Sequence, residues 1–134
     1  MPGVLLDSTV LIDALRGRAA AARLRKLRDD AVPLLTTPIN VEEIVRGLKA
    51  GEAEAATALF AGVRVMPVRR AEGERAGAWR RDYAGRGITL HQADCLVAAC
   101  AVSASARLAT ANVKDFPMPG LDVEHWPVGD RRTT

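Results

Sequence analysis

Short apolar runs alternate with helical stretches along almost the whole chain. The first run, residues 3–6, is followed by helical patterning, and the same order recurs towards the C-terminus. Strands separated by helices join through right-handed crossovers and form a mostly parallel sheet with helices on both faces. The sequence therefore predicts an α/β fold. Strands are expected at residues 3–6, 32–36, 63–66, 107–110 and 121–126.

The clearest predicted helix covers residues 90–103. Thr89-Leu90-His91-Gln92 has the form of a capping box, in which the Thr89 hydroxyl and the Gln92 amide satisfy the first turn. Apolar residues then recur at a spacing that predicts packing on a sheet. This stripe consists of Ala93, Leu96, Val97, Cys100, Ala101 and Ala104. The other helices are expected at residues 8–15, 19–28, 38–49, 52–61 and 71–84.

Length and composition indicate one folded domain. The chain has 134 residues, of which 49% are hydrophobic and 26% charged, which excludes a disordered protein. We expect a single domain over residues 1–128 and a flexible tail over 129–134. The longest uninterrupted apolar run is Cys95–Val102, far below the roughly 20 residues of a membrane span. No signal-peptide pattern is present, so a cytoplasmic protein is predicted.

Cys95 and Cys100 are interpreted as core residues. They lie five apart in one predicted helix, on different sides of it, so a disulfide between them is not expected. A zinc site with His91 is also disfavoured, because no CxxC or HxxxH spacing occurs.

The charge is compatible with a nucleic-acid partner. The net charge is +3, and most of the 19 basic residues are arginine. Guanidinium groups match phosphate geometry and stack on bases. Since a GC-rich coding sequence produces the same composition, charge alone does not decide.

Four acids stand near predicted strand ends or helix starts. Asp7 follows the first strand, and Glu43 lies early in the helix after the second. Asp94 lies in the second turn of the last predicted helix, and Asp115 follows the fourth strand. The carboxyl ends of parallel strands share one edge, so the four could converge on one pocket. A divalent cation would offset their repulsion, and oxygen-only ligands favour Mg²⁺ or Mn²⁺. That chemistry suits phosphodiester hydrolysis by metal-activated water.

Each acid also has a structural alternative. Asp7 could cap the following helix, and Glu43 could close a capping box with Asn40. Asp115 could be a turn residue. Asp94 lies among apolar neighbours and faces either solvent or a pocket.

Four motifs resemble those of PIN-domain ribonucleases, and within them the VapC-like toxins of bacterial toxin–antitoxin pairs. They are LLDSTVLID around Asp7, INVEEIVRG around Glu43, ITLHQADCLVAACA around Asp94, and LATANVKDF from Leu108 to Phe116. Each motif is weak alone, but the four occur in family order over nearly the whole chain. The resemblance implies a three-layer α/β/α domain that cleaves RNA with Mg²⁺, for which Mn²⁺ can substitute.

The resemblance also implies roles for individual residues. The catalytic acids would be Asp7, Glu43, Asp94 and Asp115, with Asp7 and Asp94 as direct ligands of one or two metal ions. Relatives carry an acid either where Asn112 or where Asp115 stands, so the fourth position stays open between them. Asn112 could coordinate through its carbonyl oxygen or orient a metal-bound water.

Supporting residues are expected around this acidic core. Ser8 could orient Asp7 or a bound phosphate, and Thr110 could do the same beside the fourth position. Ordinary capping is the alternative for both. Phosphate contacts at the rim are expected from Arg16, Arg46 and Lys49.

The predicted function is that of an endoribonuclease toxin. The family implies a cognate VapB-like antitoxin that occludes the acidic pocket, and commonly a homodimer. A catalytically silent PIN-fold RNA- or protein-binding module is the alternative. A phosphatase of the haloacid dehalogenase type is discounted, because its second Asp is replaced here by Thr9.

Overall fold

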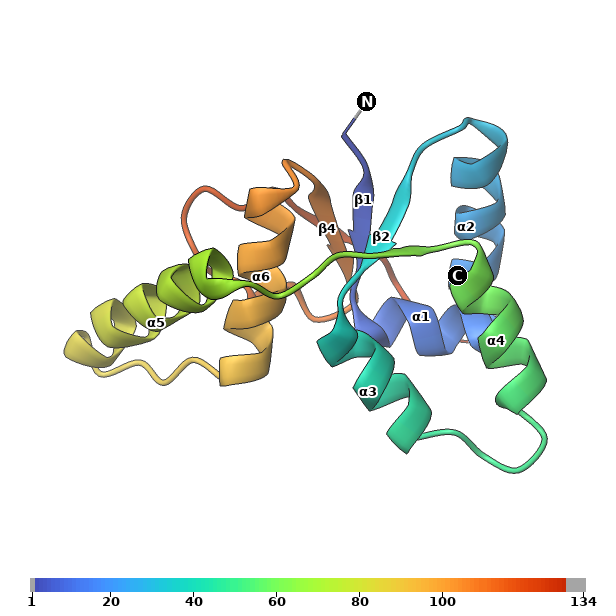
Figure 1. Ribbon diagram of the computed structural model, residues 1–134, viewed down its shortest axis with the longest axis horizontal. Coiled ribbons are helices and arrows are strands. Elements are labelled where there is room, and N and C mark those ends of the chain that lie inside the picture. Colours follow the sequence, from blue (N-terminus) through green and yellow to red (C-terminus); the bar gives the residue numbers. More distant parts are fainter. Residues whose placement is uncertain (1, 130–134) are drawn as a thin grey trace.

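Parallel strands form the central sheet of the protein (Figure 1). The computed structural model describes residues 2–129, and within them the sheet has five strands in the order β3-β2-β1-β4-β5. Every neighbouring pair is parallel. The α/β fold is therefore confirmed, and each strand lies within a predicted range. The strands are β1 (Val4–Leu6), β2 (Leu34–Thr36), β3 (Arg64–Val65), β4 (Arg107–Thr110) and β5 (Val123–His125).

Helices cover both faces of the sheet, which gives the three-layer α/β/α architecture (Figure 1). One side carries α1 (Ser8–Leu15), α2 (Ala19–Asp29), α3 (Pro38–Arg46) and α4 (Ala53–Ala61). The other side carries α5 (Arg70–Gly85) and α6 (Gln92–Ser103). A short 3₁₀ helix, η1 (Val113–Asp115), follows β4.

Side chains of the strands alternate between two cores. Leu5 of β1 and Leu108 of β4 belong to the core shared with α5 and α6. Val4 and Leu6 belong to the core on the side of α1 and α2. A parallel strand that is covered on both faces is apolar throughout. This explains why the strand runs show no alternation in the sequence.

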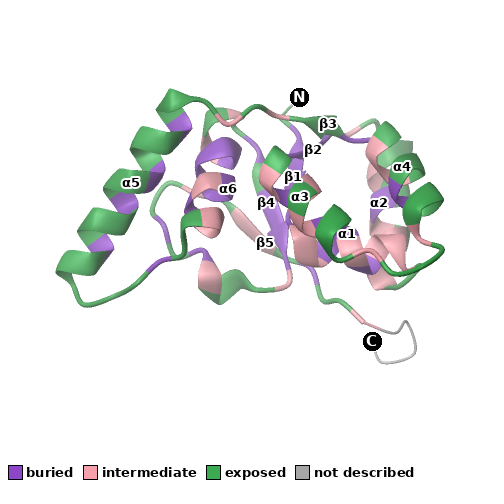
Figure 2. Ribbon diagram, turned by 60° about the horizontal axis from the view of Figure 1, so that its bottom comes forward, coloured by how far each residue is buried: buried purple, intermediate pink, exposed green. Residues whose placement is uncertain are grey.

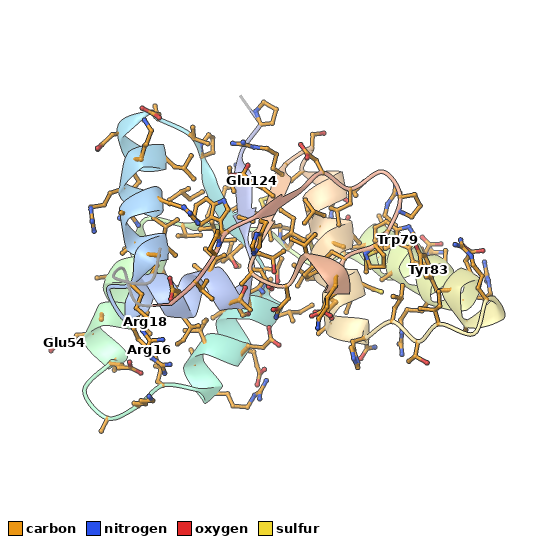
Figure 3. All side chains as sticks on the ribbon, turned by 180° about the vertical axis from the view of Figure 1, so that it is seen from behind. Arg16, Arg18, Glu54, Trp79, Tyr83 and Glu124 are labelled. Atoms are coloured by element: carbon orange, nitrogen blue, oxygen red, sulfur yellow. The ribbon has the colours of Figure 1, made fainter. Side chains whose placement is uncertain are left out.

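Helix α6 is buried on most of its surface because it lies between the sheet and α5 (Figure 2). Ala98 and Ala99 are fully buried although they lie outside the predicted apolar stripe. Ala93, Leu96 and Ala104, which belong to that stripe, are only half-buried. The predicted stripe was therefore right for Val97, Cys100 and Ala101, which are buried, but too narrow, because α6 is also buried at Ala98 and Ala99. Trp79 and Tyr83 provide the buried side of α5 (Figure 3).

The predicted capping box at Thr89 is wrong. Helix α6 begins at Gln92, and His91 occupies the N-cap position with an extended backbone and no side-chain cap bond. Leu90 is buried, and its carbonyl accepts a hydrogen bond from Arg80 Nε at 3.1 Å. These contacts hold the preceding segment outside the helix.

Helix α3 ends at Arg46, earlier than the predicted Lys49. Gly47 follows as the C-cap residue. At the other end, Thr37 caps the helix by accepting hydrogen bonds from the Ile39 and Asn40 amides at 3.2 and 3.3 Å. The alternative capping box between Asn40 and Glu43 is therefore not formed.

The remaining structural predictions concern cysteines, membrane spans and the tail. Cys95 and Cys100 are both buried and free, as predicted. None of the helices within residues 2–129 has both the length and the apolar character that crossing a membrane requires. The predicted flexible tail, apart from Gly129, lies outside the described residues.

Candidate active site

Asp7 lies at the carboxyl end of β1 and is only 8% exposed. It occupies the N-cap position of α1, but its carboxylate makes no cap hydrogen bond. Instead, Asp7 Oδ2 accepts hydrogen bonds from Thr110 Oγ1 at 2.8 Å and Thr9 Oγ1 at 3.1 Å. Asn40 Nδ2 donates a longer bond, 3.5 Å, to Asp7 Oδ1. The carboxylate is therefore oriented by neutral side chains from three different elements.

Glu43 lies on α3 and is held by a second group of neutral side chains. Ser8 Oγ donates to Glu43 Oε1 at 2.7 Å and accepts from Asn40 Nδ2 at 2.9 Å. Thr37 Oγ1 in turn donates to Asn40 Oδ1 at 2.8 Å. Ser8 thus contacts Glu43 and not Asp7. Asn40, which is fully buried, links the surroundings of the two acids.

Asp94 shows that the four acids lie near one another. Burial, followed by the charges of Asp115, Asp7 and Glu43, raises the pKa of this carboxyl from 3.8 to about 6. His91 acts in the opposite direction. Among the neighbouring carboxylates, Asp115 has the largest effect. Two of the acids, Asp7 and Asp115, follow strands β1 and β4, and the other two lie on helices α3 and α6.

The two candidates for the fourth position have different surroundings. Asp115 is half-buried in η1 and acts on Asp94. Asn112 is exposed, and its backbone N–H donates to Thr110 Oγ1 at 3.0 Å. Asn112 lines an open depression together with Lys114 and His125. Of the two, Asp115 is the residue whose charge raises the pKa of Asp94.

The three basic residues expected at the rim are engaged in different ways. Arg16 Nε pairs with Glu52 Oε2 at 3.2 Å. Arg46 forms an exposed pair with Glu42, which raises the pKa of Arg46 by hydrogen bonding and charge. The Lys49 backbone N–H donates to Glu52. Of the three, Arg16 lines a groove of about 340 Å³ that also contains Ser8 and Glu43.

The donor set suits a hard divalent cation. The converging side chains are carboxylates, hydroxyls and one amide, and such oxygen donors match Mg²⁺ or Mn²⁺. Within residues 2–129, no three Asp, Glu, His or Cys side chains are already arranged to hold a metal ion. The chemistry of the residues therefore fits the metal, although their side chains do not form a ready set of three ligands.

A model of the PIN domain matches residues 4–117. The chain belongs to the PIN-domain family. This PIN-domain protein is 36% identical to ribonuclease VapC10 of Mycobacterium tuberculosis (strain CDC 1551 / Oshkosh) over 116 residues, 86% of each chain. It is 31% identical over 115 residues to ribonuclease VapC19 of the same strain, covering 85% of this chain and 92% of the relative. Within the family it therefore belongs to the VapC ribonuclease toxins.

The PIN fold is also found in a solved toxin–antitoxin assembly. VapBC2 from Rickettsia felis, bound to a DNA fragment from its promoter, superposes with a TM-score of 0.79 at 18% identity. The match covers 92% of this chain and 98% of the other. PIN ribonucleases are typically metal-dependent. The recognised resemblance is thus confirmed at the level of family and fold.

Several polar residues of the PIN-domain site were missed in the sequence. Asn40 was considered only as a helix cap, and Thr9 only as a missing acid. In the structure, Thr9 Oγ1 donates to Asp7 and accepts from the Ala111 N–H at 3.1 Å. A signal was available for Thr9, because it belongs to a run of polar residues that follows the buried strand β1, whereas Asn40 lies inside α3 and had no such signal.

Proposed function

We propose that Asp7, Glu43, Asp94 and Asp115 form the metal site of an Mg²⁺-dependent endoribonuclease, in which Mn²⁺ can substitute. The observation that carries this proposal is that Asp7, only 8% exposed, and Glu43 are held by hydroxyl and amide side chains, while the charges of Asp7, Glu43 and Asp115 raise the pKa of Asp94. Structural acid clusters include their own cations, because unpaired buried charge is costly. In this group of acids, a bound metal ion would supply the neutralising positive charge.

The protein's own side chains define the site. Asp7 and Asp94 would hold the cation, with Asp115 as the fourth acid. Both hydroxyl donors of Asp7 bind Oδ2, which leaves Oδ1 with only the long Asn40 contact and free lone pairs for a metal. A bound divalent ion supplies Lewis acidity for the attack of water on a phosphodiester and stabilises the leaving oxygen.

Glu43 is the candidate acceptor for the proton of the attacking water. Ser8 donates to its Oε1, which leaves Oε2 available as a base or as a further ligand. No covalent nucleophile is needed in this mechanism. Ser8 and Asn40 therefore act as positioning residues for Glu43, and Thr110 and Thr9 do so for Asp7.

The proposal includes partners. A cognate VapB-like antitoxin would occlude the site, and the groove beside Ser8, Glu43 and Arg16 lies where a partner segment could cover the acids. Support comes from similar proteins that were solved as toxin–antitoxin complexes, among them one from Klebsiella pneumoniae (28% identity, TM-score 0.67, 89% of this chain and 95% of the other). We further propose a homodimer that acts on RNA in the cytoplasm.

The test is cleavage of single-stranded and structured RNA by the purified protein, with Mg²⁺, Mn²⁺ or EDTA. Asp7→Asn and Asp94→Asn should abolish cleavage, because each removes a charged ligand of similar shape. Asp29→Asn is the matched control, since Asp29 lies exposed on α2. Cleavage in EDTA, or full activity of either site variant, contradicts the proposal. Metal-independent RNA binding without cleavage would instead support the silent binding module.

A further inference from the structure

A second open depression lies directly beside the acids. It has a volume of about 570 Å³ and is lined by Ala111, Asn112, Val113, Lys114 and His125. Both of its walls start from Thr110, the residue that donates to Asp7. Residues 111–114 continue the chain from Thr110, and His125 of β5 is its partner in the parallel register. The depression and the acids therefore share one edge of the sheet.

Lys114 brings a cation to this depression. The residue is exposed and belongs to η1, the same short helix that carries Asp115. Within residues 2–129, no ion pair of Lys114 is formed. Glu124, which precedes His125 on β5, already accepts hydrogen bonds from Arg107 and from the Trp126 indole, each at 2.8 Å. The lysine charge is thus available to a ligand.

The other lining groups suit a base more than a simple anion. His125 presents an exposed planar ring, and Val113 is 39% exposed beside it. Asn112 offers both donors and an acceptor, and its exposed side chain makes no helix-cap bond. Unstacked RNA bases are bound by stacking on planar side chains and by hydrogen bonds to their edges, while lysine binds phosphate. The volume lies within the range of small-ligand sites.

We propose that this depression binds one nucleotide of single-stranded RNA, next to the bond that is cut. Lys114 contacts its phosphate, His125 and Val113 pack on its base, and Asn112 bonds to the base edge. The position of this nucleotide next to a cleaved bond rests on the proposed ribonuclease function, whereas the binding of RNA at this place does not. An acidic peptide would use Lys114 but has no need of a stacking surface.

The binding test uses a fluorescent single-stranded RNA of about 12 nucleotides and the full chain in EDTA, at several salt concentrations. Lys114→Ala should weaken binding about tenfold and reduce the slope of log K against log salt by about 0.7, because one phosphate contact is lost. His125→Ala should weaken binding about tenfold without changing the slope, and His125→Phe should restore it. Lys26→Ala on α2 is the matched control and should bind like the wild type.

Cleavage by the same variants separates this proposal from the ribonuclease proposal. Lys114→Ala and His125→Ala should raise KM much more than they lower kcat, with unchanged melting temperatures, since both side chains are exposed. If the wild-type protein binds the RNA but does not cleave it with Mn²⁺, only the ribonuclease proposal is overturned. Absent RNA binding by the wild type, or wild-type affinity and salt slope in both variants, overturns the proposal for the depression.

Discussion

Two carboxylates near opposite ends of α6, Glu72 of α5 and Asp94 of α6 itself, have their pKa values shifted in opposite directions. Glu72, only 1% exposed near the C-terminal end of α6, accepts hydrogen bonds from Arg69 and from Ser103 at 2.6 Å. These contacts lower its pKa to about 2. Asp94, near the N-terminal end, has its pKa raised to about 6 by burial and by other acids. Glu72 is thus an acid that stabilises the fold, whereas Asp94 is an acid that we propose binds a ligand.

The largest expected effect comes from the hydroxyl that holds Asp7. Thr110→Val keeps the shape of a fully buried side chain but removes the 2.8 Å bond to Oδ2. Loss of such an orienting partner should reduce cleavage about 10- to 100-fold. Thr36→Val is the matched control, because Thr36 is equally buried and donates only to the Leu6 carbonyl at 3.1 Å. Each variant should lose about 1 kcal/mol of stability. If the two variants cleaved RNA at the same rate, Thr110 would have no role in orienting Asp7.

The next effect concerns the structural acid. Glu72→Gln should lower the free energy of unfolding by about 2 kcal/mol, because the charged bonds to Arg69 are weakened. This figure is reduced to allow for the solvent screening of Arg69, whose side chain is 64% exposed. Glu74→Gln, on the exposed side of α5, should change stability little. Urea unfolding measures both. A similar loss in the two variants would show that burial of Glu72 is unimportant.

The two acids should respond to pH with opposite signs. The lowered pKa of Glu72 stabilises the fold above pH 4.5, and this contribution is lost as the pH falls towards 2. The difference in stability between wild type and Glu72→Gln should therefore be constant near neutral pH and shrink in acid. The raised pKa of Asp94 gives a penalty in metal-free protein that is absent below pH 3.8 and complete above about 6. If the difference in stability between wild type and Glu72→Gln grew as the pH falls, the lowered pKa of Glu72 would be contradicted.

The smallest effect is that of Asp94→Asn on metal-free protein. The substitution removes one repelling charge, so stability in EDTA should be unchanged or higher by up to about 1 kcal/mol at neutral pH. The melting temperature measures it. A marked decrease would mean that Asp94 supports the fold, as Glu72 does.

The positions of the acids in the fold were predictable from the sequence, but the side chains that hydrogen-bond to them were not. Asp7 and Asp115 follow strands, and parallel topology brings strand ends to one edge. In contrast, the bond between Thr110 and Asp7 spans 103 positions and depends on the pairing of β1 with β4. No local pattern encodes such a contact.

Local sequence patterns also gave wrong predictions where tertiary contacts compete with them. Thr89 and Gln92 have capping-box spacing, yet the burial of Leu90 moves the helix start to Gln92. The pair of Arg46 with Glu42 is the opposite case, because its i,i+4 spacing was visible in the sequence. That spacing indicates an ion pair on the helix surface, whereas the resemblance to the family led us to expect a phosphate contact from Arg46.

We propose that the acids at the sheet edge together bind a divalent cation. The most direct test of this binding is the melting temperature of the protein as Mn²⁺ is added, compared between wild type, Asp7→Asn, Asp94→Asn and the control Asp29→Asn. Saturating metal should stabilise wild type and Asp29→Asn by about 2 to 3 kcal/mol, a rise of several degrees, and should leave both site variants unchanged. An equal rise in all four proteins, or none in the wild type, would contradict the claim.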